Sequence, residues 1–111
     1  MNIDTRIEGA SVIMAVAGRM DADQASAFEE ACKSATASAP NLVVDLSGLD
    51  YVSSMGLRAF LTVAKDRESA GARLTLVNLH GFAKQVFDVT RLTSLFHTVS
   101  SVEEALRSAG K

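Results

Sequence analysis

Short apolar runs that alternate with amphipathic segments constrain the fold of this chain more than any other feature. The runs 11–17, 41–46 and 73–78 have the length and the β-branched content of strands. The intervening segments 21–35 and 55–71 carry apolar residues three and four positions apart, which is the period of a helix with one buried face. Because parallel strands need a long crossover connection, this alternation predicts a largely parallel sheet of the α/β class.

The first residues predict a hairpin in front of that pattern. Ile3, Thr5 and Ile7 alternate with polar residues, as in a strand with one face in water. Gly9-Ala10 suits a tight turn into the second strand, and we expect Gly18 to end that strand. The sheet is therefore predicted to be mixed, with one antiparallel pair.

The last third of the chain predicts three shorter elements. Residues 82–87 favour a third helix, and residues 96–99 favour a brief edge strand. Ser100 or Ser101 is then expected to cap a last helix. With no internal repeat or linker, we expect a single domain over residues 1–111, in the order β-β-α-β-α-β-α-β-α.

Charge and cysteine content exclude several classes of function. The net charge is −2 and no run of Lys or Arg is present, so we expect no nucleic-acid partner. Cys32 is the only cysteine, which excludes an internal disulfide and fits a reducing compartment. The first residues show no signal-peptide pattern, and no apolar run approaches the roughly 18 residues of a spanning helix. We expect a cytoplasmic protein without direct membrane insertion.

The sequence carries no motif of a known catalytic site. The patterns GxxxxGK[ST], GxGxxG and GxSxG are all absent. His80 and His97 are the only histidines, and neither has a second metal-type ligand at a helical spacing. We therefore expect no metal, no cofactor and no enzymatic activity. A Ser-His-Asp site that uses Ser54 stays open, because such triads are recognised by geometry.

Ser53 and Ser54 lie between the central strand and an amphipathic helix, and this position has two interpretations. In the first, one serine is only the helix N-cap, which contributes about 1 kcal/mol. In the second, a serine at the helix start is phosphorylated: backbone N–H groups and the helix dipole accommodate the phosphate, and a partner packed on the neutral serine meets a dianion. Asp21, three residues before Gln24, likewise either caps the first helix or lies near Ser54 and shapes a partner site.

The segment 45–57, with the sequence DLSGLDYVSSMGL, joins the central strand to the second helix. It is similar to the signature of the STAS-domain anti-sigma-factor antagonists. Residues 18–21, GRMD, resemble the motif that this family carries between its second strand and first helix. Residues 82–87 and 92–96 resemble the family's segment around the third helix, so the resemblance covers nearly the whole chain in order.

This resemblance implies a single STAS domain with a mixed four- to five-stranded sheet and about four helices, packed mainly on one face. It implies an antagonist without catalysis of its own, whose unphosphorylated form binds an anti-sigma factor that is also a serine kinase of the GHKL type. Phosphorylation ends that binding, and a PP2C-type phosphatase reverses it. The family's phosphoacceptor falls on Ser54, and its functional aspartate falls on Asp21.

The expected partner-binding surface comprises Asp21, Ser53, Ser54, Met55, Gly56, Leu57 and Arg58. Three of these residues depart from the family pattern. Ser53 stands where many members have Asp, which makes it a competing phosphoacceptor. Met55 replaces a small residue, and Arg58 replaces a common Gly and can pair with a phosphate. The alternative function is a constitutive STAS scaffold that docks on the ATPase of a lipid-transport ABC system.

Overall fold

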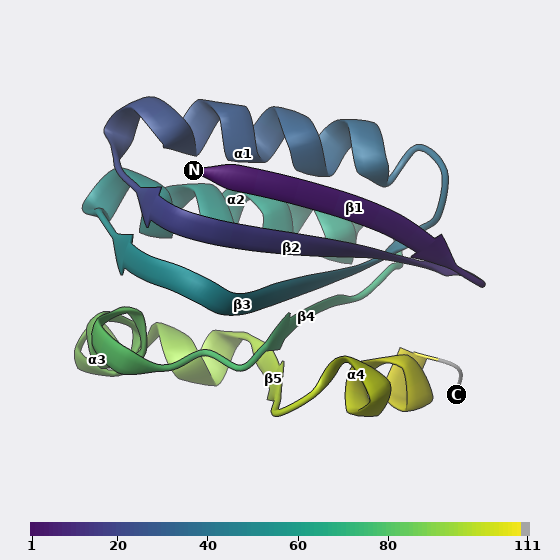
Figure 1. Ribbon diagram of the computed structural model, residues 1–111. Helices are drawn as coiled ribbons and strands as arrows, with labels where there is room; N and C mark the ends of the chain where they lie inside the picture. The colour runs from purple at the N-terminus through teal and green to yellow at the C-terminus, as the bar shows by residue number, and fades with distance from the viewer. Residues whose placement is uncertain (110–111) are drawn as a thin grey trace.

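The computed structural model describes residues 1–109, and its elements follow the predicted order (Figure 1). They are β1 (Asn2–Glu8), β2 (Ser11–Met20), α1 (Ala22–Ala35), β3 (Asn41–Val52), α2 (Ser54–Ser69), β4 (Leu74–Val77), α3 (Gly81–Val89), the 3-10 helix η1 (Leu92–Leu95), β5 (His97–Val99) and α4 (Val102–Ala109). The sequence did not predict η1. The last two residues of the predicted domain, 110–111, lie outside the described residues.

The strands form one mixed sheet in the order β1-β2-β3-β4-β5. β1 pairs with β2 antiparallel, and the other three pairings are parallel. The predicted hairpin and the predicted parallel sheet are therefore both confirmed. The helices α1 and α2 supply the crossover connections that β2-β3 and β3-β4 require.

Both β2 and β3 run further than the sequence predicts. β2 continues to Met20 and β3 continues to Val52, so the predicted ends at Gly18 and Leu46 are wrong. The two strands stay paired through two shifts of register. Gly18 has a φ of 98°, which a glycine adopts at little cost. Such irregular pairing leaves no periodic pattern in the sequence, yet it carries both strands to the starts of α1 and α2.

Helices cover the two faces of the sheet unequally (Figure 1). The larger core lies between one face and the helices α1, α2 and α3, and it contains the buried rings Phe28, Phe60, Phe87 and Phe96. A smaller core lies on the other face, where Ala105 of α4 packs against Ile13, Val43, Val77 and Val99. Packing of the helices mainly on one face is thus confirmed. No helix in residues 1–109 is long and apolar enough to cross a membrane.

Candidate functional site

The ends of β2 and β3 bring the starts of two helices together. Met20 and Val52 are opposite each other at the end of this parallel pair. One residue later, the Ser53 N–H donates a hydrogen bond of 2.9 Å to the Met20 carbonyl oxygen. Asp21 and Ser53, which follow the two strands, are the N-cap residues of α1 and α2. The two motifs that the sequence singles out, 18–21 and 45–57, therefore meet at this end of the sheet.

The two serines have different roles in the start of α2. The Ser53 hydroxyl accepts a hydrogen bond of 3.2 Å from the Gly56 N–H, so Ser53 is the cap. Ser54 is the first helical residue and is exposed, and within residues 1–109 its hydroxyl makes no hydrogen bond. Of the two serines that could cap the helix, Ser53 is therefore the one that does so. Ser53 is engaged in the fold, whereas Ser54 offers a free hydroxyl to the solvent.

Asp21 has the capping role that one interpretation of the sequence gave it. Its Oδ1 accepts a hydrogen bond of 3.2 Å from the Gln24 N–H, and its side chain is half-buried. In the described part of the chain its carboxylate makes no hydrogen bond with Ser54. Asp21 therefore lies at the same end of the sheet as Ser54 without binding its hydroxyl.

The remaining predicted surface residues divide into exposed and buried ones. Met55 is 45% exposed, and Arg58, one turn after Ser54, is also exposed. Leu57 is only 8% exposed and packs in the main core, and Gly56 is buried as well. A Cβ atom on Gly56 would lie 2.7 Å from Val52 Cγ2 and 3.0 Å from the Met20 carbonyl oxygen. Gly56 thus lets the first turn of α2 pack closely against the ends of both strands.

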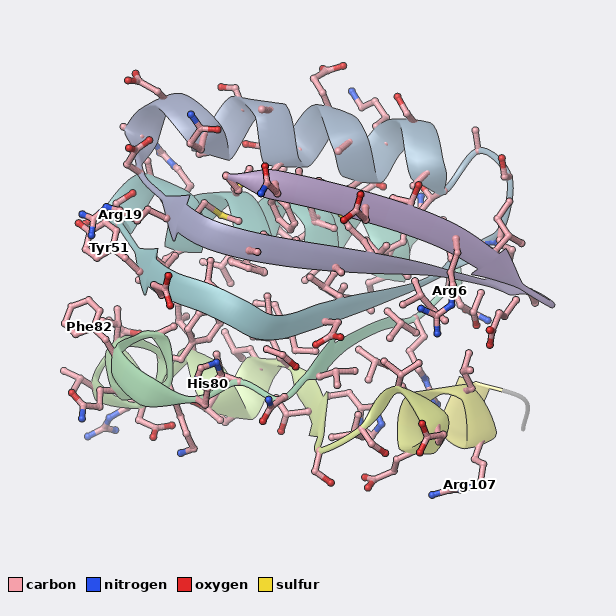
Figure 2. The ribbon with its side chains drawn as sticks, in the orientation of Figure 1. Arg6, Arg19, Tyr51, His80, Phe82 and Arg107 are labelled. Atoms are coloured by element: carbon pink, nitrogen blue, oxygen red, sulfur yellow. The ribbon has the colours of Figure 1, made fainter. Side chains whose placement is uncertain are left out.

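An aromatic stack that the sequence analysis missed lies at the same end of the sheet (Figure 2). The guanidinium carbon of Arg19 lies 4.2 Å from the centre of the Tyr51 ring. The Tyr51 ring also stacks on the Phe82 ring, with 5.7 Å between the ring centres and 11° between the ring planes. Phe82, from α3, is 51% exposed. The pairing of Arg19 with Tyr51 follows from the strand register, which sequence alone does not reveal.

The apolar surface continues from Phe82 along α3. Val89 is 82% exposed, and a shallow groove of about 240 Å³ is lined by Phe82, Val86, Val89 and two polar neighbours. A spacing of four and three residues places these three apolar side chains on one helix face. The same spacing is visible in the sequence, where it predicted the third helix but not an exposed apolar face. Only Ala83 and Phe87 of α3 are fully buried.

The geometry does not assemble the residues of a hydrolase. The Nε2 atom of His80 lies 3.0 Å from the Ser47 carbonyl oxygen, and His97 is exposed on β5. Neither ring is hydrogen-bonded to Ser54, whose hydroxyl has no hydrogen-bond partner in residues 1–109. The same residues contain no group of three or more His, Cys, Asp or Glu side chains arranged to hold a metal. No Ser-His-Asp triad is therefore present around Ser54 in the described chain.

Comparison with known protein families decides the identity of the domain. The model of the STAS domain family matches residues 2–105, which is nearly the whole chain. The chain is a STAS domain. A relative from Bordetella bronchiseptica, named as the anti-sigma factor antagonist BtrV, is 39% identical to this STAS domain over 64 residues. That alignment covers 58% of the chain and spans only 55% of the length of BtrV.

Solved structures of other STAS proteins share the fold. A crystal structure described as an anti-sigma factor antagonist from Thermotoga maritima superposes with a TM-score of 0.90 at 17% identity, covering 98% of this chain and 95% of the other. The Bacillus cell fate determinant SpoIIAA, in its phosphorylated form, superposes with a TM-score of 0.74 at 16% identity, covering 96% and 98%. At these identities the likeness concerns the fold of the STAS domain alone.

Proposed function

We propose that this STAS domain is an anti-sigma factor antagonist that works by partner switching. Its unphosphorylated form binds an anti-sigma factor that is also a serine kinase of the GHKL type. Phosphorylation of Ser54 ends the binding, and a PP2C-type phosphatase restores it. The domain contributes no catalysis of its own. It acts in the cytoplasm and binds neither nucleic acid nor the membrane directly.

The observation that carries this proposal is the difference between the two serines. A kinase must reach a hydroxyl that is exposed and free, and Ser54 meets both conditions. Ser53 is half-buried and its oxygen is engaged by the Gly56 N–H at 3.2 Å. Phosphorylation of Ser53 would have to break the cap of α2, whereas phosphorylation of Ser54 leaves it in place. We therefore assign Ser54 as the proposed phosphoacceptor, and Ser53 is the competing site that a test must exclude.

The local electrostatics suit a phosphate at this position. The phosphate adds about −1.5 to −2 charges next to the first-turn N–H groups of α2, at the positive end of the helix dipole. Arg58 is exposed one helical turn further on, where its guanidinium can pair with the phosphate. The modified domain thus keeps its fold, while a partner packed on Met55 and Ser54 meets a hydrated dianion.

The partner surface extends beyond the predicted residues to the stack of Arg19, Tyr51 and Phe82. This stack is exposed at its Phe82 end and lies at the same end of the sheet as Asp21 and Ser54. Arginine and exposed aromatic side chains are the residue types that dominate protein interfaces. A partner that covers Ser54 and Met55 would therefore gain an apolar and cationic anchor beside them.

The first experiment incubates the domain with ATP, magnesium and the kinase encoded near its gene, and maps the product by intact and tandem mass spectrometry. We expect one added phosphate on Ser54, present in Ser53→Ala and absent in Ser54→Ala. A phosphate that maps to Ser53 would contradict the assignment. No phosphate from a kinase shown to be active and bound would instead favour the constitutive scaffold that docks on a transporter ATPase.

Binding to the same kinase tests the switch itself. Ser54→Asp should weaken binding roughly tenfold or more, because an unpaired charge in a desolvated interface costs several kcal/mol. Ser69→Asp is the matched control: it makes the same substitution at an exposed position at the far end of α2 and should bind like the wild type. Equal affinities of the wild type and Ser54→Asp would contradict the proposal.

A further inference from the structure

β1 is a free edge of the sheet. It pairs with β2 alone in residues 1–109 and lies at the end of the strand order (Figure 1). Six of its seven residues are exposed, and only Ile3 is half-buried. Free strand edges present unpaired backbone groups and are templates for another strand, so soluble proteins normally obstruct them with bulges, proline, charged side chains or coverage. The charged residues of β1, Asp4, Arg6 and Glu8, are of both signs. β1 is regularly paired along its whole length and contains no proline.

The hairpin turn decides which backbone groups of β1 face outwards. Gly9 and Ala10 form a two-residue turn between Glu8 and Ser11, and Gly9 has a φ of 61°. In such a turn the flanking residues form a hydrogen-bonded pair, and hydrogen-bonded and non-hydrogen-bonded pairs then alternate along the strand. The N–H and C=O groups of the odd-numbered residues Ile3, Thr5 and Ile7 therefore point away from β2.

The side chains of the same three residues lie on the face of the sheet that α1 covers. Ile7 is 56% exposed although its cross-strand neighbour Val12 is buried. A groove of about 460 Å³ runs between β1 and α1, and the α1 side of it is lined by small residues: Ala31, Ser34, Ala35 and Ser38, the last just beyond the helix. The edge strand is thus flanked by space for further apolar side chains.

We propose that two copies of this chain associate through β1, antiparallel about a two-fold axis at Thr5. Thr5 then faces Thr5, and Ile3 faces Ile7 of the second copy. All of these residues have outward-facing backbone groups, so the strands exchange about six hydrogen bonds. Ile7 is covered by Ile3 of the second copy above the groove. The product is one continuous sheet with five strands from each copy.

Charge selects this register over its neighbours. Asp4, Arg6 and Glu8 project on the opposite face, where Figure 2 shows Arg6, and Arg6 already pairs with Glu8 at 3.3 Å. With Thr5 on the axis, Asp4 of each copy lies directly opposite Arg6 of the other, in the closer, non-hydrogen-bonded type of pair. A shift of two residues in one direction brings Asp4 against Asp4, and in the other direction Arg6 against Arg6. Opposite charges meet only in the central register of these three.

The proposed interface is separate from the surface around Ser54. β2 lies between β1 and β3, and Ser54 follows β3. The association therefore does not depend on the function proposed for Ser54. It would present two switch surfaces in one particle.

Sedimentation velocity over a concentration series tests the interface through a charge swap. Arg6→Asp and Asp4→Arg each place like charges opposite each other at both symmetric positions. Each should raise the dimer dissociation constant roughly tenfold or more. The double variant Asp4→Arg with Arg6→Asp restores opposite charges in the same register and should return the constant close to that of the wild type. Lys65→Asp, an equal charge change on the exposed side of α2, is the control and should have no effect.

Three outcomes would overturn the proposal. The first is a wild type that stays monomeric at every concentration, and the second is a dimer that responds to neither single variant. The third is a double variant that fails to recover while its thermal unfolding matches that of the wild type. Amide exchange provides an independent readout. Protection should rise with concentration at the Ile3, Thr5 and Ile7 amides, which face outwards, and stay constant at Asp4 and Arg6, which already bond to β2. Protection that rises elsewhere instead would also contradict the interface.

Discussion

Cys32 is a buried residue whose ionisation is coupled to the fold. Its side chain, 3% exposed, lies in the main core, with its sulfur 3.9 Å from that of Met14. Burial raises the pKa of the thiol from its ordinary value of 9.0 to about 12, and the neighbouring Glu29 carboxylate adds to the shift. The native thiol therefore keeps its proton at pH values where the unfolded chain loses it, and it is a poor nucleophile.

The raised pKa predicts a loss of stability in alkaline solution. Between the ordinary pKa of 9.0 and about 12, the native state binds one more proton than the unfolded state, so the free energy of unfolding falls as pH rises. The free energy of unfolding of the wild type should fall more steeply with pH than that of Cys32→Ala, by about 1 kcal/mol per pH unit. Urea unfolding of both proteins across this range measures the difference. Parallel slopes would show that Cys32 does not titrate with unfolding.

At the scale of elements, the site depends on how closely α2 approaches the ends of β2 and β3. The backbone hydrogen bond from Ser53 to Met20 and the absence of a side chain at Gly56 fix this approach. The exposed position of Ser54 follows from it, because the residue before it is held as the cap and the residues after it are packed. A change at Gly56 therefore tests the placement of the whole helix start.

Gly56→Ala should destabilise the domain although alanine is the better helix former. The new methyl group would lie 2.7 Å from Val52 Cγ2 and 3.0 Å from the Met20 oxygen. Overpacking costs about 1–3 kcal/mol, against a gain in helix propensity of about 1 kcal/mol. Urea unfolding should show a net loss, while Thr62→Ala on the exposed side of α2 should stay within about 0.5 kcal/mol of the wild type. A more stable Gly56→Ala protein would mean that α2 does not pack this closely against the ends of β2 and β3.

At the scale of the molecule, two groups of aromatic rings have different roles. Phe28, Phe87 and Phe96 surround Phe60 at distances of 4.8 to 6.4 Å between ring centres, and this cluster fills the core between α1, α2, α3 and η1. Phe82 lies outside it, half-exposed against Tyr51. The first group stabilises the fold, and the second is available to a partner.

This division predicts opposite effects of two similar truncations. Phe60→Ala should cost about 3–5 kcal/mol, a large part of the 5–15 kcal/mol that stabilises a typical domain. Phe82→Ala should cost no more than about 1 kcal/mol, because it loses one exposed stacking contact. Denaturant unfolding compares the two, and similar losses would contradict the division. Since Phe82→Ala keeps the fold, its affinity for the proposed kinase partner isolates the contribution of Phe82 to binding.

The sequence by itself determined the order of the elements, the hairpin, the parallel sheet and the position of a helix start at Ser53-Ser54. These features depend on local periodicity, turn residues and capping, which act over a few positions. Hydrophobic periods of two and of about 3.6 residues separate the strands from the helices, and Asp21 with Gln24 marks the start of α1 through a local hydrogen bond.

The tertiary structure alone decided which groups meet and which stay free. Irregular pairing extends β2 and β3, because backbone hydrogen bonds across strands do not require a periodic pattern. The same pairing sets Arg19 on Tyr51, while the packing of α3 adds Phe82 from a remote part of the chain. The structure also holds the Ser53 hydroxyl in a hydrogen bond and leaves Ser54 exposed, although the two side chains are identical. Adjacent serines have the same chemistry, so only their positions relative to the helix distinguish them.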